Sequence, residues 1–292
     1  AWEDHNEIKV MSQNQYLGAD LAPLLVADQD QFNGVLVGIL KKVADSRFRD
    51  RAQRQAAQIA KEHPHVVALQ EVWRLDCQDL SNPPVQGHGC DDPEIKAAFV
   101  DHLQVTLLAL KAQRQQYKAV AIVKNLDVSL IQAPNLPAGI PFVINGFPAV
   151  LNTIDRDAIL VRRDIPAQRV DFTNICPRIS LDGCNYQAIV KAPIFGGTPD
   201  GLPSERGFVA VDVKVGEKNY RIVNTHLELR EPDPTQPLSR FYQAAQATEL
   251  IQTLQLTTPM GKSLLVLGDM NSSPEDKVIP GPLPLPAPFN NG

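Results

Sequence analysis

The feature that most limits what this chain can fold into is an apolar run that ends in acid and amide side chains. Residues 264–267 read Leu-Leu-Val-Leu and are followed by Gly268, Asp269, Met270 and Asn271. Such a run predicts a strand, and the polar groups then lie at its C-terminal end, where open sheets build active sites. Asp and Asn after a strand also form ordinary turns, so this motif alone leaves both interpretations open.

Three further strand-like runs carry polar groups of the same kind at one end. The runs and the residues that follow them are 8–13 with Asn14, 65–70 with Glu71 and 220–225 with His226. Carboxylate, carbonyl and water oxygens are the ligands that Mg²⁺ prefers, and it usually takes only one or two protein carboxylates. Four strands that end in such groups predict a site for metal-assisted phosphoryl transfer.

The ordered set of motifs resembles the metal-dependent endonuclease/exonuclease/phosphatase superfamily, which includes secreted deoxyribonucleases, neutral sphingomyelinases and inositol polyphosphate phosphatases. The segments that carry the resemblance follow the family's order and are residues 10–14, 68–72, 157–163, 205–208, 224–228 and 267–271. Each segment is short, and their order makes the resemblance specific. It implies an α/β fold, a four-layer sandwich with two central, mainly antiparallel sheets flanked by helices.

The resemblance also implies a role for individual residues. Glu71 would be the principal metal ligand, with Asn14 orienting Glu71 and the metal through its amide oxygen. Asp269 would orient the attacking water or assist its deprotonation, and Asn271 would hold the phosphate or the metal. His226 would hydrogen-bond a phosphoryl oxygen and stabilise charge in the transition state.

Two further residues and the cofactor follow from the same resemblance. Arg206, in Glu-Arg-Gly-Phe, resembles the family's arginine near the substrate phosphate, although a surface arginine fits the same pattern. Asp157 stands where many members have Asn, so its role stays open. The expected cofactor is Mg²⁺, with Mn²⁺ or Ca²⁺ as alternatives.

The four cysteines fall into two close pairs in loop-like segments, Cys77 with Cys90 and Cys176 with Cys184. Four cysteines allow three connectivities, and adjacency favours these two loop-closing disulfides. A zinc site is the competing interpretation, but no CxxC spacing is present. Disulfides indicate an oxidising compartment, and a secreted or periplasmic protein whose signal peptide was removed begins with polar residues like these. A cytosolic protein with unpaired thiols looks the same.

Charge and local composition bear on the substrate. A formal net charge of −5 argues against non-specific binding to a nucleic-acid backbone, although a basic stretch lies at residues 47–54. Residues 133–150 carry no charge. We interpret them either as a loop packed against the core or as an exposed apolar loop that contacts a membrane surface or the hydrophobic part of a substrate. We therefore expect a phospholipid or other small phosphodiester as substrate. A secreted nuclease is the alternative.

The remaining pattern predicts one domain over residues 1–279 and a proline-rich tail, or the start of a loop, at 280–292. The expected elements are helices within 32–60 and over 95–115 and 241–256, paired strands at 157–163 and 207–215, and a hairpin turn at 216–219.

One family feature has no counterpart in the sequence. Members of the family finish with a further strand pair and a Ser-Asp-His segment whose histidine is the general base or acid, and nothing after Asn271 matches it. We therefore expect the domain to be incomplete at its C-terminus, either as a fragment or with another polypeptide completing the fold. A non-catalytic binding protein on the same fold is the alternative of another class.

Overall fold

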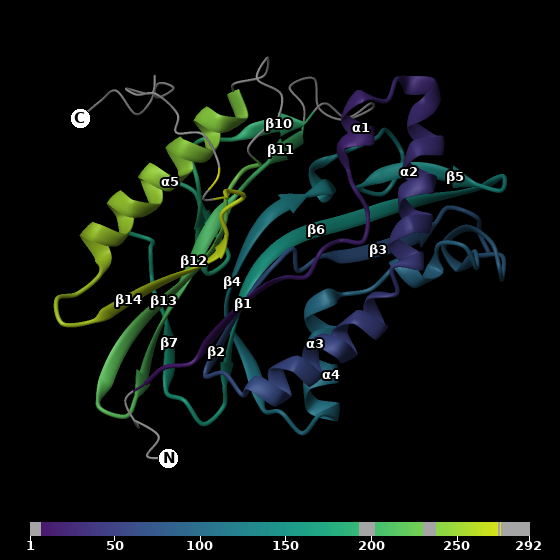
Figure 1. The fold of residues 1–292 in the computed structure, drawn as a ribbon. Coiled ribbons are helices and arrows are strands. Elements are labelled where there is room, and N and C mark those ends of the chain that lie inside the picture. The colour runs from purple at the N-terminus through teal and green to yellow at the C-terminus, as the bar shows by residue number, and fades with distance from the viewer. Residues whose placement is uncertain (1–6, 193–201, 230–237, 274, 276–292) are drawn as a thin grey trace.

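The computed structural model describes residues 7–192, 202–229, 238–273 and 275 (Figure 1). Two six-stranded sheets, A and B, pack face to face, and helices cover the outer side of each. This arrangement is the four-layer α/β sandwich expected from the sequence. The expected tail at 280–292 lies outside the described residues. Within the described ranges, none of the helices combines the length and the apolar character that crossing a bilayer requires.

Sheet A is organised around one long strand. Its strands are β1 (Val10–Asn14), β2 (Val66–Gln70), β3 (Arg74–Asp79), β4 (Tyr117–Asp127), β5 (Ile140–Ile144) and β6 (Phe147–Arg162). The first part of β6 pairs with β3 and β5, and its second part pairs with β2 and β4, all antiparallel. β1 and β2 are parallel, so Asn14 and Gln70 lie opposite each other at the two C-terminal ends.

Sheet B has the order β14-β13-β12-β9-β8, with β7 also paired to β12. Its strands are β7 (Ala167–Arg169), β8 (Ile179–Ser180), β9 (Gly183–Asn185), β12 (Gly207–Val215), β13 (Lys218–His226) and β14 (Ser263–Asp269). β12 and β13 form the expected hairpin, and Gly216 supplies the positive φ of +58° that its tight turn needs. β13 and β14 are parallel, which places His226 opposite Asp269. The short strands β10 (Val190–Ala192) and β11 (Leu202–Ser204) form a separate pair.

The prediction that residues 157–163 pair with residues 207–215 is wrong. The first segment belongs to β6 in sheet A and the second is β12 in sheet B. The two strands pack face to face, with Ile159 against the cluster that contains Val209 and Val211. An apolar strand pattern shows that a strand is buried, but it does not distinguish edge pairing from packing between sheets.

Helices cover the two outer faces. The helices are α1 (Ala22–Val26), α2 (Gln29–Asp45), α3 (Phe48–Glu62), α4 (His102–Ala112) and α5 (Leu238–Thr257). The helices α2, α3 and α4 lie on sheet A, and α5 lies on sheet B (Figure 1). Ala52, Ala56 and Ile59 recur at helical spacing on α3 and are fully buried. The expected helix over 95–115 begins only at His102, because the Asp101 side chain accepts hydrogen bonds from the first turn.

The uncharged segment 133–150 supplies β5 and the beginning of β6. Ile140, Phe142 and Ile144 on β5 are 6%, 3% and 2% exposed, whereas Val143 between them is 45% exposed. The alternation is that of a strand with one face on the core. The apolar face of β5 is therefore packed against the core, as in the first interpretation, and contact of the exposed residues with a membrane surface stays a prediction.

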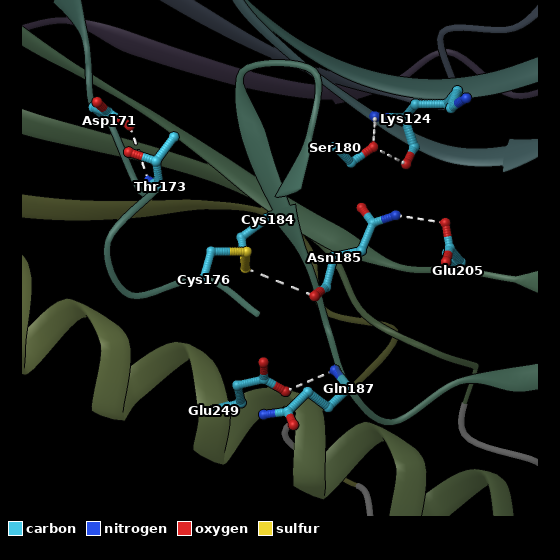
Figure 2. The surroundings of a disulfide bond; sticks show 10 residues. All are labelled: Lys124, Asp171, Thr173, Cys176, Ser180, Cys184, Asn185, Gln187, Glu205 and Glu249. Carbon is cyan, nitrogen blue, oxygen red and sulfur yellow. Dashed lines mark hydrogen bonds between the residues drawn. A yellow bond between two sulfur atoms is a disulfide. The ribbon is translucent and has the colours of Figure 1, made fainter. Parts of the chain in front are cut away.

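Both expected disulfides are present, and all four cysteines are used in them: Cys77–Cys90 and Cys176–Cys184. The second disulfide ties a loop to β9 beside Asn185 (Figure 2). Asn185 Nδ2 donates a hydrogen bond of 2.6 Å to Glu205 Oε2, and Gln187 N donates one of 2.9 Å to Glu249 of α5. The first contact holds the residue that precedes Arg206, and the second ties the segment after β9 to α5.

Candidate active site

The candidate site lies where four strands end. The parallel pairs β1–β2 and β13–β14 each direct their C-terminal ends to the same side of the sandwich, and the edge strands β1 and β14 lie against each other. The polar residues at these ends are Asn14, Glu71, His226, Asp269 and Asn271. Parallel pairing aligns the strand ends within each sheet, and the contact of β1 with β14 brings together residues that are 255 positions apart, Asn14 and Asp269.

Asn14 connects the two carboxylates of the site. Its Nδ2 donates to Glu71 Oε1 at 2.9 Å and to Asp269 Oδ2 at 3.0 Å. Its amide oxygen accepts from the backbone N–H of Tyr16 at 2.7 Å, which orients the side chain. Asn14 thus holds the carboxylates of sheet A and sheet B at one point.

Glu71 occupies a strained backbone position at the end of a fully buried strand. Its φ is +54°, in the left-handed region that non-glycine residues rarely adopt. The second carboxylate oxygen accepts from the backbone N–H of Leu17 at 3.0 Å. Strain of this kind persists where the surrounding structure fixes a functional group, and here the contacts to Asn14 and Leu17 hold the carboxylate.

Asp269 and Asn271 form a compact turn after β14. Asp269 Oδ1 accepts from the backbone N–H of Asn271 at 3.0 Å, and Asn271 Nδ2 donates to the carbonyl of Leu227 at 2.8 Å. Gln243 of α5 donates to the carbonyl of Asn271 at 2.8 Å and to that of Glu228 at 3.1 Å. One side chain of α5 therefore holds the segments that follow β13 and β14 together.

His226 is almost completely buried beside Asp269. Its Nε2 lies 3.9 Å from Asp269 Oδ2, and its Nδ1 lies 3.1 Å from Nη1 of Arg206. Burial, followed by the charge of Arg206, lowers the pKa of His226 well below its usual value. His226 is therefore a neutral imidazole near neutral pH.

Arg206 lies in a buried group of acids that the sequence pattern did not reveal. Its guanidinium is 3.7 Å from Glu228 Oε2 and 4.0 Å from Asp155 Oδ2. Burial opposes the charged form, but Glu228 and Asp155 outweigh it, and the pKa of Arg206 lies above its usual value. Burial also raises the pKa of Asp155 well above its usual range, with the charge of Asp157 acting in the same direction.

Asp157, whose role the sequence left open, is a buried residue beneath the site. Asn125 Nδ2 donates to Asp157 Oδ2 at 3.0 Å. Burial raises the pKa of Asp157 to about 7, against the hydrogen bond from Asn125 and the charge of Arg206. Asp155 was missed although it lies two positions from Asp157 and so faces the same side of β6. Glu228 was missed in the same way, although it lies two positions after His226.

The donor chemistry fits a divalent cation of the Mg²⁺ type. Glu71 offers a half-buried carboxylate, and the carboxylate of Asp269 is held beside it by the same amide. In the described part of the chain, no three His, Cys, Asp or Glu side chains are grouped as a metal cage. Mg²⁺ does not require one, because it commonly binds one or two carboxylates and completes its shell with water and phosphate oxygens.

Comparison with known families identifies the class of protein that this fold and site define. The chain matches the endonuclease/exonuclease/phosphatase family over residues 38–287, and it belongs to that family, a family of phosphoester hydrolases. A comparison with curated proteins finds no matching sequence.

Several solved structures are similar to the chain. A β-hairpin deletion mutant of beta toxin from Staphylococcus aureus is 14% identical to this chain, with a TM-score of 0.43. The matched region covers 93% of this chain and 69% of the toxin chain. A Leptotrichia buccalis member of the family is 14% identical with a TM-score of 0.42, at 91% and 67% coverage. The human nocturnin catalytic domain with bound sulfate is 18% identical with a TM-score of 0.39, at 77% and 59% coverage.

Proposed function

We propose that this chain is a metal-dependent phosphodiesterase in which water attacks phosphorus in line with the leaving oxygen. The observation that carries the proposal is the convergence of Glu71 and Asp269 on the single amide of Asn14. The Nε2 of His226 lies 3.9 Å from the same Asp269 oxygen. A cation ligand, a proton acceptor and a hydrogen-bond donor therefore meet within one small volume.

Each residue has a distinct part in the proposed reaction. Glu71 holds the divalent ion, which when bound supplies Lewis-acid stabilisation of the phosphoryl and leaving oxygens. Asp269 accepts a hydrogen bond from the attacking water and takes its proton. His226, neutral, donates a hydrogen bond to a phosphoryl oxygen. Asn271 donates its amide N–H to the carbonyl of Leu227, so its amide oxygen would be the group that helps to hold the divalent ion.

For the substrate we propose a small phosphodiester or a phospholipid head group first and a nucleic acid second. The support is the net charge of −5, which disfavours a polyanionic backbone. Contact with a membrane surface through residues 133–150 has less support, because Ile140, Phe142 and Ile144 of β5 face the core and leave Val143 as the large apolar side chain exposed on this strand. The two disulfides support export to an oxidising compartment, and we propose a secreted or periplasmic location.

Hydrolysis of bis(4-nitrophenyl) phosphate by the intact protein tests the reaction class. We expect turnover with Mg²⁺, loss of turnover in EDTA, and loss in Glu71→Gln. The matched control is Glu62→Gln, which removes a carboxylate from an exposed pair with Lys9 and should keep full activity. Parallel assays with sphingomyelin vesicles and with DNA rank the substrates. If the folded, Mg²⁺-loaded protein turns over none of them, the phosphodiesterase proposal fails for this chain, and the alternatives are a non-catalytic binding protein and a domain that needs a further polypeptide for activity.

A further inference from the structure

Arg206 is already engaged by the protein before any substrate arrives. Its side chain is 14% exposed, and its partners Asp155 and Glu228 are themselves 5% and 10% exposed. Glu228 is held in turn, because its Oε1 accepts from the backbone N–H of Leu229 at 3.0 Å and its own N–H donates to Gln246 at 2.8 Å. The guanidinium thus lies between two carboxylates of the protein at ion-pair distances, and its hydrogen bond goes to His226.

The contact between Arg206 and His226 has only one possible direction. A guanidinium carries N–H donors and no acceptor, and it stays charged in proteins. At 3.1 Å, Nη1 of Arg206 therefore donates and Nδ1 of His226 accepts. A neutral imidazole that accepts at Nδ1 carries its single proton on Nε2. That nitrogen is the one that faces Asp269.

We propose that Arg206 is a positioning residue that holds His226 as the tautomer protonated at Nε2, so that His226 donates a hydrogen bond into the site. The catalytic consequence rests on the phosphodiesterase function proposed above, whereas the tautomer itself is a property of the protein without substrate. In this account Asp155 and Glu228 orient Arg206, and Arg206 orients His226. The arginine acts through the histidine and does not contact the phosphate.

The tautomer is measured directly by long-range ¹H–¹⁵N NMR on the intact protein with Mg²⁺ and no substrate. The His226 signals are assigned by their loss in His226→Gln. We expect one pyrrole-type nitrogen, Nε2, and one pyridine-type nitrogen, Nδ1. A wild-type His226 protonated at Nδ1 overturns the proposal, and this result needs no other variant to fold.

A substitution tests whether Arg206 is the cause. In Arg206→Met the Nδ1 acceptor loses its donor, and we expect a mixture of the two His226 tautomers. The matched control is Arg221→Met, which removes a buried arginine of β13 that is paired with Asp212, 2.8 Å away. The control should leave the His226 signals unchanged. An unchanged tautomer in folded Arg206→Met contradicts the proposal.

Kinetics separate positioning from phosphate binding. Loss of a group that orients another commonly costs about 10-fold to 100-fold, and we expect a loss of that size in kcat with little change in KM. A rise in KM with unchanged kcat makes Arg206 a phosphate ligand and overturns the proposal. If the wild type hydrolyses no phosphodiester, the proposed function fails while the tautomer measurement still decides the role of Arg206.

Discussion

Gln70 and Asn224 join the two sheets next to the active site. Gln70 Nε2 donates to Asn224 Oδ1 at 2.6 Å, and the Asn224 amide donates to two main-chain carbonyls of sheet A at 2.8 and 3.0 Å. Gln70 directly precedes Glu71, and Asn224 lies two residues before His226. This contact therefore helps to set the separation between the metal-binding half and the phosphate-facing half of the site.

Asn224→Ala should destabilise the protein more than Gln70→Ala. The first change removes the closer acceptor of Gln70 Nε2, which keeps only a bond of 3.2 Å to Ser12 Oγ, and it removes the side-chain donor to two buried carbonyls. Each buried polar group left unsatisfied costs about 1–3 kcal/mol. Urea unfolding followed by circular dichroism measures the difference. Gln104→Ala on the exposed side of α4 is the control and should stay within about 0.5 kcal/mol of wild type. Equal stability of Asn224→Ala and wild type would show that the sheets do not depend on this contact.

Asn14→Ala should lower activity more than stability. Without the bridging amide the Glu71 and Asp269 carboxylates lose their common donor, and we expect phosphodiester turnover to fall about 10-fold to 100-fold. A steady-state assay with a Mg²⁺ titration measures the effect, because a weakened Glu71 site also needs more metal. Full activity at ordinary Mg²⁺ concentrations would show that the site does not depend on the Asn14 amide to position Glu71 and Asp269.

Gly268→Ala should destabilise the protein, because this glycine has a φ of +147° and a Cβ there would lie 2.0 Å from the carbonyl oxygen of Thr225. We expect the free energy of unfolding to fall by about 1–3 kcal/mol. Gly34→Ala is the opposite case, because the glycine lies within α2 and no atom stands within 4 Å of the new Cβ. It should stabilise by about 0.5–1 kcal/mol. Thermal unfolding of both variants checks the pair, and a stable Gly268→Ala would refute the close approach of β14 to β13.

Asp157→Asn should change how stability depends on pH. Burial raises the pKa of Asp157 from 3.8 to about 7, so the folded protein binds a proton that the unfolded chain has released. Wild-type stability from this group is complete below pH 3.8 and is lost as pH rises through about 7. The Asn variant lacks this loss, so its stability relative to wild type should grow between pH 4 and about 7.

The quantity to compare is the difference in unfolding free energy between wild type and Asp157→Asn at each pH. The pKa of His226 is lowered by burial, so its contribution has the opposite sign and is lost as pH falls. Both proteins contain His226, and this contribution cancels between them. Asp155 does not cancel, because the charge of Asp157 raises its pKa, so the two curves differ by the response of the Asp155–Asp157 pair. Unfolding by urea in EDTA at several pH values gives the two curves, and parallel curves would show that Asp157 is ionised in the folded protein.

The strand ends of the site were predictable because their position follows from local pattern. Asn14, Glu71, His226 and Asp269 each follow a strand-like run, and parallel pairing brings the ends of such strands together. The two disulfides were predictable because adjacent cysteines in loops leave few alternatives, and the structure confirms both pairings. The catalytic roles given to these residues stay predictions.

The groups that support the site were not predictable, because their contacts cross between elements far apart in the sequence. Arg206 lies near Asp155 only because sheet B packs on sheet A. For the same reason residues 157–163 and 207–215, which were expected to pair edge to edge, contact each other face to face. Gln243 looks like any polar helix residue, yet it holds the ends of two strands. Local patterns carry no information on such contacts.

The most direct test of the central claim compares wild type with Asp269→Asn in the hydrolysis of bis(4-nitrophenyl) phosphate. The substitution keeps the shape of the side chain and removes the group that accepts the proton of the attacking water. We predict wild-type turnover that requires Mg²⁺ and a loss of about 10²-fold to 10⁴-fold in the folded variant. Wild-type rates in Asp269→Asn, or a folded, Mg²⁺-loaded wild type without turnover, would contradict the account.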